Sequence, residues 1–138
     1  MIAATDFLLD PRLAADSAFV ADGPLSQVRL MNDARFPWLV LVPRVPETSE
    51  WLELDGAQQR LLLAEINQAG NLIRTEPGME KLNIGALGNI VRQLHVHLVG
   101  RHAGDAAWPA PVWGSGAAQR YPQAALKAKI AYWRKRLA

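Results

Sequence analysis

The 138-residue sequence contains no cysteine. This absence excludes a disulfide framework and thiol chemistry, and it fits a reducing compartment such as the cytoplasm. The sequence also lacks any apolar run near the roughly 18 residues that a membrane span needs. Residues 1–6 contain neither the basic stretch nor the uninterrupted apolar stretch that an export signal begins with. We therefore expect a soluble, cytoplasmic protein that has no contact with a membrane.

Internal repeats, low-complexity stretches and signs of a second domain are missing as well, so residues 1–138 are expected to form a single domain. With 50% hydrophobic and 20% charged residues, the composition is that of a globular protein. The net charge of +2 favours anionic ligands in general. Basic residues gather near the C-terminus, between Lys127 and Arg136, but a solvent-facing helix explains such a cluster more often than a nucleic-acid surface. No nucleic acid partner is expected.

Short apolar runs separated by turn residues predict an antiparallel sheet. The turn Asp22-Gly23-Pro24 joins two of these runs into a predicted hairpin, and Pro43 ends a third run, which we interpret as a buried central strand. The predicted strands cover residues 18–21, 26–31, 38–42, 81–87 and 93–99.

Two helices are expected beside this sheet. Asp55 and Gln58 have the spacing of a capping box, and the helix that they begin should end at about Thr75, because Pro77 and Gly78 follow. A second helix follows Pro122, and a short helical turn begins after Asp10. The Gly-, Pro- and Trp-rich residues 104–114 should form an ordered extended segment that packs on the fold or on a partner subunit. The fold class is therefore α+β, with an antiparallel sheet of about five to six strands.

Two of the three histidines lie in the run Gln93-Leu94-His95-Val96-His97-Leu98-Val99. Alternation along a strand sends Leu94, Val96 and Leu98 to the core and Gln93, His95 and His97 to the opposite face. Side chains two residues apart stand roughly 6.6 to 6.8 Å apart along a strand, so both imidazoles can reach the oxygens of one phosphate group. Near pH 7 a neutral imidazole is also a nucleophile.

On the residues alone, the two histidines could instead have a structural or a metal-binding role. Both could be surface residues of a half-exposed strand. An HxH zinc site would need a third ligand, and the only other histidine is His102, beyond Gly100 and Arg101.

The run QLHVHLVGR resembles the signature of the histidine triad (HIT) nucleotide hydrolases and transferases, and the resemblance extends over about residues 17–101. Gln93 stands at the first triad position, while His95 and His97 match the second and third. The resemblance implies that His95 is the nucleophile that takes up the nucleotidyl group. It also implies that residue 93 acts through its backbone carbonyl, which holds the other ring nitrogen of the nucleophile as a donor. Glutamine keeps that carbonyl.

Further site residues follow from the same resemblance. Asn32 and Asp33 match the stretch that binds the ribose hydroxyls, although Asn and Asp also favour turns for their own sake. Many relatives place another histidine where this sequence has Trp38. The residues that the resemblance brings to the phosphate are His97, Asn89, Asn83, Gly88 and Gln93, with Asn83 matching only if its loop is one residue shorter. Backbone amides near Gly85 and Gly88 can hold phosphate oxygens.

The resemblance implies a hydrolase that cleaves at the α-phosphorus of a purine nucleotide or dinucleotide. Nucleoside phosphoramidates and dinucleoside polyphosphates, such as diadenosine tetraphosphate, are the substrate classes concerned. No cofactor or metal is implied, and relatives are commonly homodimers. Because Gln93 and Trp38 replace two histidines, a nucleotide-binding module with little catalysis is an alternative. A nucleotidyl transferase is another.

Overall fold

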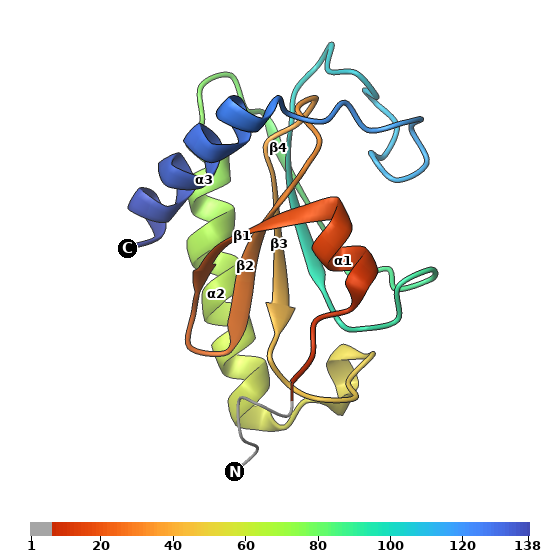
Figure 1. The fold of residues 1–138 in the computed structure, drawn as a ribbon, viewed down its shortest axis with the longest axis vertical. Helices are drawn as coiled ribbons and strands as arrows, with labels where there is room; N and C mark the ends of the chain where they lie inside the picture. Colours follow the sequence, from red (N-terminus) through yellow and green to blue (C-terminus); the bar gives the residue numbers. More distant parts are fainter. Residues whose placement is uncertain (1–6) are drawn as a thin grey trace.

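The computed structural model describes residues 7–138, so the expectation about an export signal, which rests on residues 1–6, lies outside the described residues. The chain folds into a five-stranded antiparallel sheet with the strand order β1-β2-β3-β5-β4, flanked by helices (Figure 1), and the α+β prediction is confirmed. The strands are β1 (Ser17–Asp22), β2 (Ser26–Met31), β3 (Trp38–Pro43), β4 (Lys81–Gly85) and β5 (Val96–Arg101).

Three helices begin where the sequence predicts them. Asp10 caps α1 (Pro11–Asp16) by accepting a hydrogen bond from the Arg12 amide. Asp55 and Gln58 form the expected capping box at the start of α2 (Gly56–Arg74). The C-terminal helix α3 (Gln123–Leu137) follows Pro122. A 3₁₀ turn, η2 (Trp51–Glu53), precedes α2. Within residues 7–138, none of the helices has the length and hydrophobicity of a membrane span.

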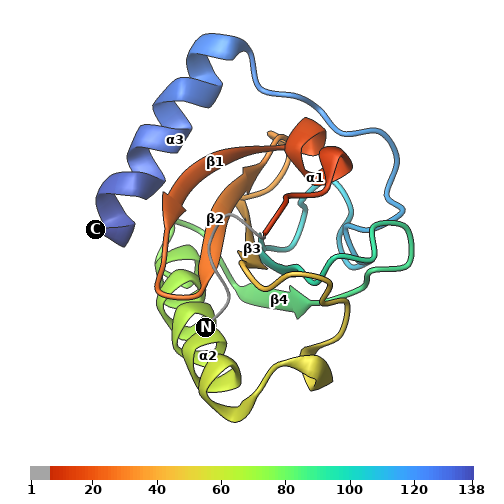
Figure 2. The ribbon, with the colours of Figure 1, turned by 60° about the horizontal axis from the view of Figure 1, so that its bottom comes forward.

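The sheet separates two apolar layers, and Figure 2 shows the helices around the sheet with the bottom of the molecule brought forward. On one side α2 and α3 pack against the sheet, with Leu62, Ile73 and Trp133 buried against Leu39 and Leu98. On the other side α1 and the segment after β5 cover the sheet. That second layer is built from Leu13, Phe36, Trp38, Val40, Val42, Val99 and Val112. Both histidines of the motif face this second layer.

The histidine strand begins three residues later than the sequence predicts. β5 starts at Val96, not at Gln93, and it pairs with β3 on one side and β4 on the other. Continuing the β3 ladder would place Leu94 opposite Pro43, which has no N–H to donate. The Leu94 amide donates to the carbonyl of Thr48 instead, over 2.9 Å. β4 ends at Gly85, two residues before the predicted end, and Gly85 pairs with His97.

The predicted division of faces holds despite the later start. Leu94, Val96 and Leu98 lie in the core under the helices. His95 and His97 lie on the opposite side, where they are 7% and 6% exposed. They are therefore buried residues, and the interpretation of the two histidines as surface residues is wrong.

Candidate functional site

A pocket of about 580 Å³ opens where the chain enters β5. It is walled by α1, by the connection between β2 and β3, by the loop before β5 and by residues 112–120. The structure brings six of the predicted site residues to its lining: Asn32, Asp33, Gly88, Asn89, His95 and His97. The volume lies within the range of roughly 300 to 1,000 Å³ that is usual for small-molecule sites.

His95 is oriented by the backbone of the residue two positions earlier. Its Nδ1 lies 2.6 Å from the carbonyl oxygen of Gln93. A carbonyl oxygen only accepts hydrogen bonds, so Nδ1 must carry the hydrogen. In the neutral ring Nε2 then keeps its lone pair, and that nitrogen is the nucleophilic one.

His97 is held from the neighbouring strand. The indole Nε1 of Trp38, at the start of β3, donates to Nδ1 of His97 over 3.0 Å. The rings of His95 and Trp113 pack edge-on against the same imidazole, with centroids 4.8 and 5.5 Å away. Burial, with a smaller effect from the charge of His95, lowers the pKa of His97 to about 3. The ring is therefore neutral near pH 7.

The side chain of Gln93 does not line the pocket. Its Oε1 accepts from the Asp10 amide and its Nε2 donates to the Leu8 carbonyl, each over 2.8 Å. The side-chain amide thus links the segment before α1 to the residues that precede β5. Residue 93 contributes a carbonyl to His95 and uses its side chain elsewhere.

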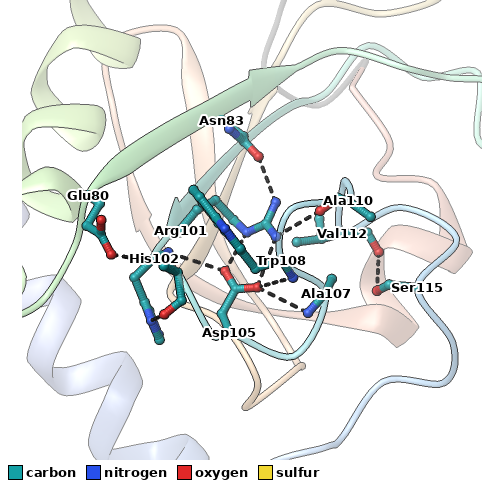
Figure 3. Close-up of polar contacts among 11 residues, drawn as sticks. Glu80, Asn83, Arg101, His102, Asp105, Ala107, Trp108, Ala110, Val112 and Ser115 are labelled. Atoms are coloured by element: carbon teal, nitrogen blue, oxygen red, sulfur yellow. Dashed lines mark hydrogen bonds and ion pairs between the residues drawn. The ribbon is translucent and has the colours of Figure 1, made fainter.

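Asn83 lies outside the pocket as well. It sits on β4, and its Oδ1 accepts from Nη1 of Arg101 over 2.9 Å (Figure 3). Asn89, by contrast, is exposed in the loop before β5, and Gly88 beside it has a φ of 70°. That left-handed conformation is one that glycine adopts at little cost. Of the loop residues that the resemblance assigns to the phosphate, Gly88 and Asn89 line the pocket.

The two ribose candidates use their oxygens to hold the chain that leads into α3. Oδ1 of Asn32 accepts from the Tyr121 amide over 2.9 Å. Asp33 pairs with Arg35 over 2.8 Å and accepts from the Gln119 amide over 3.3 Å. Burial raises the pKa of Asp33, but the hydrogen bonds from Arg35 and Gln119 outweigh it and hold the pKa below its ordinary value. The pocket therefore contains a charged carboxylate whose position is fixed.

Several lining residues were not identified from the sequence. Trp113 and Val112, from the Pro- and Trp-rich segment, form an apolar wall with Leu13 of α1. Gly85 makes room for Trp113, because a Cβ there would lie 2.9 Å from the indole Cη2. The missing side chain of Gly85 thus admits a tryptophan and not, as expected, a ligand. The sequence signalled that this segment packs on the fold, but not onto which residues.

Arg101 organises that segment from the other end of β5. Its guanidinium pairs with Asp105 over 2.7 Å and also donates to Asn83 and to the carbonyl of Ala110 (Figure 3). The rings of Phe36 and Trp108 lie against it, at 5.5 and 5.8 Å. The network fixes the path that carries Val112 to the pocket.

The third histidine lies away from His95 and His97. Within residues 7–138 no three histidine, aspartate or glutamate side chains are grouped so that they could hold a metal ion. His102, the third histidine, follows β5 at its far end, and its Nδ1 contacts the carbonyl of Ala103. His95 and His97 are therefore a pair.

Comparisons with known proteins agree with this geometry. The HIT domain family matches residues 12–104. A histidine triad (HIT) protein from Sinorhizobium meliloti 1021 is 44% identical, with a TM-score of 0.89 over 98% of this chain and 97% of that one. The histidine triad protein blr8122 from Bradyrhizobium japonicum is 41% identical, with a TM-score of 0.91 over 96% and 98%. A histidine triad protein from Marinobacter aquaeolei VT8 is 43% identical, with a TM-score of 0.87 over 96% and 98%. Among curated proteins, none matches the sequence.

Proposed function

This chain belongs to the histidine triad (HIT) family, and from that premise we propose that it is a nucleotide hydrolase acting at the α-phosphorus of a nucleoside substrate. The observation that carries the proposal is the His95 ring, which is buried in the pocket wall with Nδ1 against the Gln93 carbonyl. That contact directs the lone pair to Nε2. Nucleoside phosphoramidates and dinucleoside polyphosphates, with a purine base, are the proposed substrate classes.

The proposed reaction has two steps. Nε2 of His95 forms a bond to the α-phosphorus, and the bond from phosphorus to the leaving nitrogen or oxygen breaks, with the electron pair going to the leaving group. The ring then carries a positive charge, which the Gln93 carbonyl stabilises through the Nδ1 hydrogen. Water next attacks the phosphorus, the N–P bond breaks with its electron pair returning to Nε2, and the proton that water loses goes to solvent. A nucleoside monophosphate leaves, and His95 regains its lone pair.

The remaining pocket residues have roles that fit their positions. His97, Asn89 and the backbone amides near Gly88 stabilise the phosphate oxygens as negative charge develops on them. Asn32 and Asp33 line the pocket, and their proposed role is to bind the ribose hydroxyls. The apolar wall of Val112 and Trp113 offers a surface for the base. Like its relatives, the protein is proposed to work as a homodimer, which sedimentation analysis would test.

Because Trp38 and Gln93 stand where relatives have histidines, a second candidate function is nucleotide binding without catalysis. Trp38 and Gln93 use their polar side-chain atoms within the fold. If catalysis needs histidines at these positions, the pocket would bind a nucleotide without turning it over. Calorimetric titration with AMP, together with an assay of an adenosine phosphoramidate, separates the two functions, because tight binding without turnover would favour the binding module.

The covalent intermediate gives the sharpest test of the hydrolase. The protein is mixed with substrate and quenched in base, and the peptides are analysed by mass spectrometry for a nucleotidyl group. We expect the adduct on His95, its loss in His95→Asn and its persistence in His102→Asn, which removes a histidine outside the pocket. An adduct on another residue, or wild-type turnover by His95→Ala, would contradict the mechanism.

A further inference from the structure

Trp38 determines which nitrogen of His97 carries the hydrogen. Its indole Nε1 lies 3.0 Å from Nδ1 of His97, and both side chains are buried, each 6% exposed. An indole nitrogen can donate but cannot accept, so Nδ1 of His97 must present its lone pair. In the neutral ring the hydrogen is therefore on Nε2.

The neighbouring histidine is held in the opposite form. The Gln93 carbonyl accepts from Nδ1 of His95, which places the lone pair of His95 on Nε2. In both rings the hydrogen bond found among the described residues is made by Nδ1, which leaves Nε2 for a ligand. Two imidazoles whose centroids are 4.8 Å apart thus offer the pocket one lone pair and one N–H.

The surroundings of His97 favour its neutral form. β3 places Trp38 against the ring, β4 places Gly85 opposite it, and the segment after β5 places Trp113 on it. His95 is the one ionisable side chain among the described neighbours of the ring, and burial together with His95 lowers the pKa of His97. The charged residues that line the pocket form two pairs, Asp33 with Arg35 and Asp16 with Arg120. No carboxylate among the described residues therefore contacts the ring to favour a second proton.

On the basis of the proposed function, we infer that Trp38 makes His97 a fixed hydrogen-bond donor that does not act as an acid, and that Trp38 thereby selects the leaving group. To give up its Nε2 hydrogen, a neutral imidazole would have to become an imidazolate. Taking a second proton would require breaking the bond from Trp38. The leaving group therefore receives no proton from His97.

The two proposed substrate classes differ in their need for that proton. When a phosphoanhydride P–O bond breaks, the phosphate takes the electron pair and leaves as a stable anion. When a phosphoramidate P–N bond breaks, the nitrogen takes the pair and must acquire a proton from solvent. Trp38 is thus a positioning residue that favours phosphoanhydrides, such as dinucleoside polyphosphates, over phosphoramidates of basic amines.

Nuclear magnetic resonance of the ¹⁵N-labelled, substrate-free protein tests the hydrogen bond without any assay of activity. We expect a scalar coupling across the bond from Nε1 of Trp38 to Nδ1 of His97, with His97 protonated only on Nε2 and His95 on Nδ1. In Trp38→Phe the coupling disappears and the pKa of His97 rises by about half a unit to one unit, the worth of one hydrogen bond. Trp113→Phe is the matched control, because its ring centroid is 5.5 Å from His97, against 5.6 Å for Trp38, and it makes no hydrogen bond to that ring.

Kinetics then test the selection of the leaving group. The ratio of kcat/KM for adenosine 5′-phosphoramidate to that for diadenosine tetraphosphate is measured in wild type, Trp38→Phe and Trp38→His. We expect Trp38→His to raise this ratio at least about tenfold, because a titrating side chain beside His97 restores a proton source. An Nδ1 hydrogen on His97 in the wild type, or an unchanged ratio in both variants, would overturn the inference. If the wild type forms no His95 adduct, the proposed hydrolase fails, and the resonance experiment alone decides the role of Trp38.

Discussion

The two ends of β5 bury polar side chains in different ways. Near the start, His95 and His97 each make one hydrogen bond through Nδ1, and both line the pocket. At the end, Arg101 uses Nε, Nη1 and Nη2 in four hydrogen bonds to Asp105, Asn83 and Ala110. All three side chains are less than 10% exposed. Both ends therefore bury polar side chains. They differ because the histidines leave Nε2 free of hydrogen bonds to the described residues, whereas Arg101 uses all three of its side-chain nitrogens.

That difference separates a reactive site from a structural one. A buried donor or acceptor without a partner costs about 1 to 3 kcal/mol, so the hydrogen bonds that Arg101 makes within the protein avoid this cost. Arg101 satisfies its donors within the protein and stabilises the segment that carries Val112 and Trp113. The histidines keep Nε2 for the pocket. Substitutions at the two ends should therefore affect different measured quantities.

The largest effect is expected at the nucleophile. His95→Ala removes the attacking nitrogen, so kcat/KM should fall roughly 10⁴-fold or more. The free energy of unfolding should change by no more than about 1 kcal/mol, because the ring makes a single hydrogen bond. Steady-state kinetics and urea denaturation on the same preparation measure the two quantities. If the variant lost activity only because it was unfolded, the claim that His95 serves activity and Arg101 serves stability would be wrong.

The reverse pattern is expected at Arg101. Arg101→Met leaves the Asp105 carboxylate buried without its cation, which should lower the free energy of unfolding by about 3 to 5 kcal/mol. Activity should fall only through the disorder of the segment around Trp113. Urea denaturation measures the loss.

The control for Arg101 is an exposed arginine with a looser pair. Arg120 lies 3.6 Å from Asp16 and its side chain is 56% exposed. Arg120→Met should cost no more than about 1 kcal/mol. Equal losses in Arg101→Met and Arg120→Met would show that the buried network contributes nothing special to stability.

The pH dependence of the free energy of unfolding should report on the Arg101–Asp105 pair without removing Arg101. Hydrogen bonds from Arg101 hold the pKa of Asp105 well below its ordinary value. A carboxyl whose pKa is lowered by folding contributes stability above its unfolded pKa, near 3.9, and that contribution is lost as the pH falls further toward the folded pKa. The stability difference between wild type and Asp105→Asn should therefore stay constant from about pH 7 to 5 and shrink below about pH 4. Denaturation curves across this range provide the measurement, and a difference that already shrinks above pH 5 would contradict the assignment.

Much of the fold could be predicted because its signals are local. The Asp55–Gln58 capping box, the turn after Asp22 and the apolar run ended by Pro43 each specify structure within a few residues, and each prediction is confirmed. The start of β5 was missed because it depends on its partner. Pro43 cannot continue the ladder, and Thr48 takes the Leu94 amide instead, a contact across 46 positions that no periodicity reveals.

The candidate site was predictable to a similar depth. The alternation of His95 and His97 with apolar residues placed both on one face, and the structure shows them there. Partners distant in sequence decided the rest. Trp38 reaches His97 across 59 positions, and Asn83 is drawn to Arg101 instead of the pocket. Which partner each polar side chain finds depends on residues that are distant in the sequence, and a short motif does not contain that information.

The smallest effect is expected at Gln93, where the motif departs from three histidines. Its carbonyl orients His95, while its side chain bridges the Asp10 amide and the Leu8 carbonyl. Because Gln93→Ala keeps the carbonyl, kcat/KM should fall by only about tenfold, which corresponds to about 1.4 kcal/mol of transition-state stabilisation. The loss of two hydrogen bonds should lower the free energy of unfolding by about 1 to 2 kcal/mol.

Gln93→His supplies the family residue at the same position and completes the comparison. A neutral imidazole also has one donor and one acceptor, but its ring holds them in a different geometry from the amide, so the segment before α1 should loosen without a gain in turnover. Kinetics of both variants on one phosphoramidate measure the outcome. A loss above about a hundredfold in Gln93→Ala, of the size seen for oxyanion donors, would mean that the amide reaches the substrate. A large gain in Gln93→His would likewise show that the side chain, and not the carbonyl, governs His95.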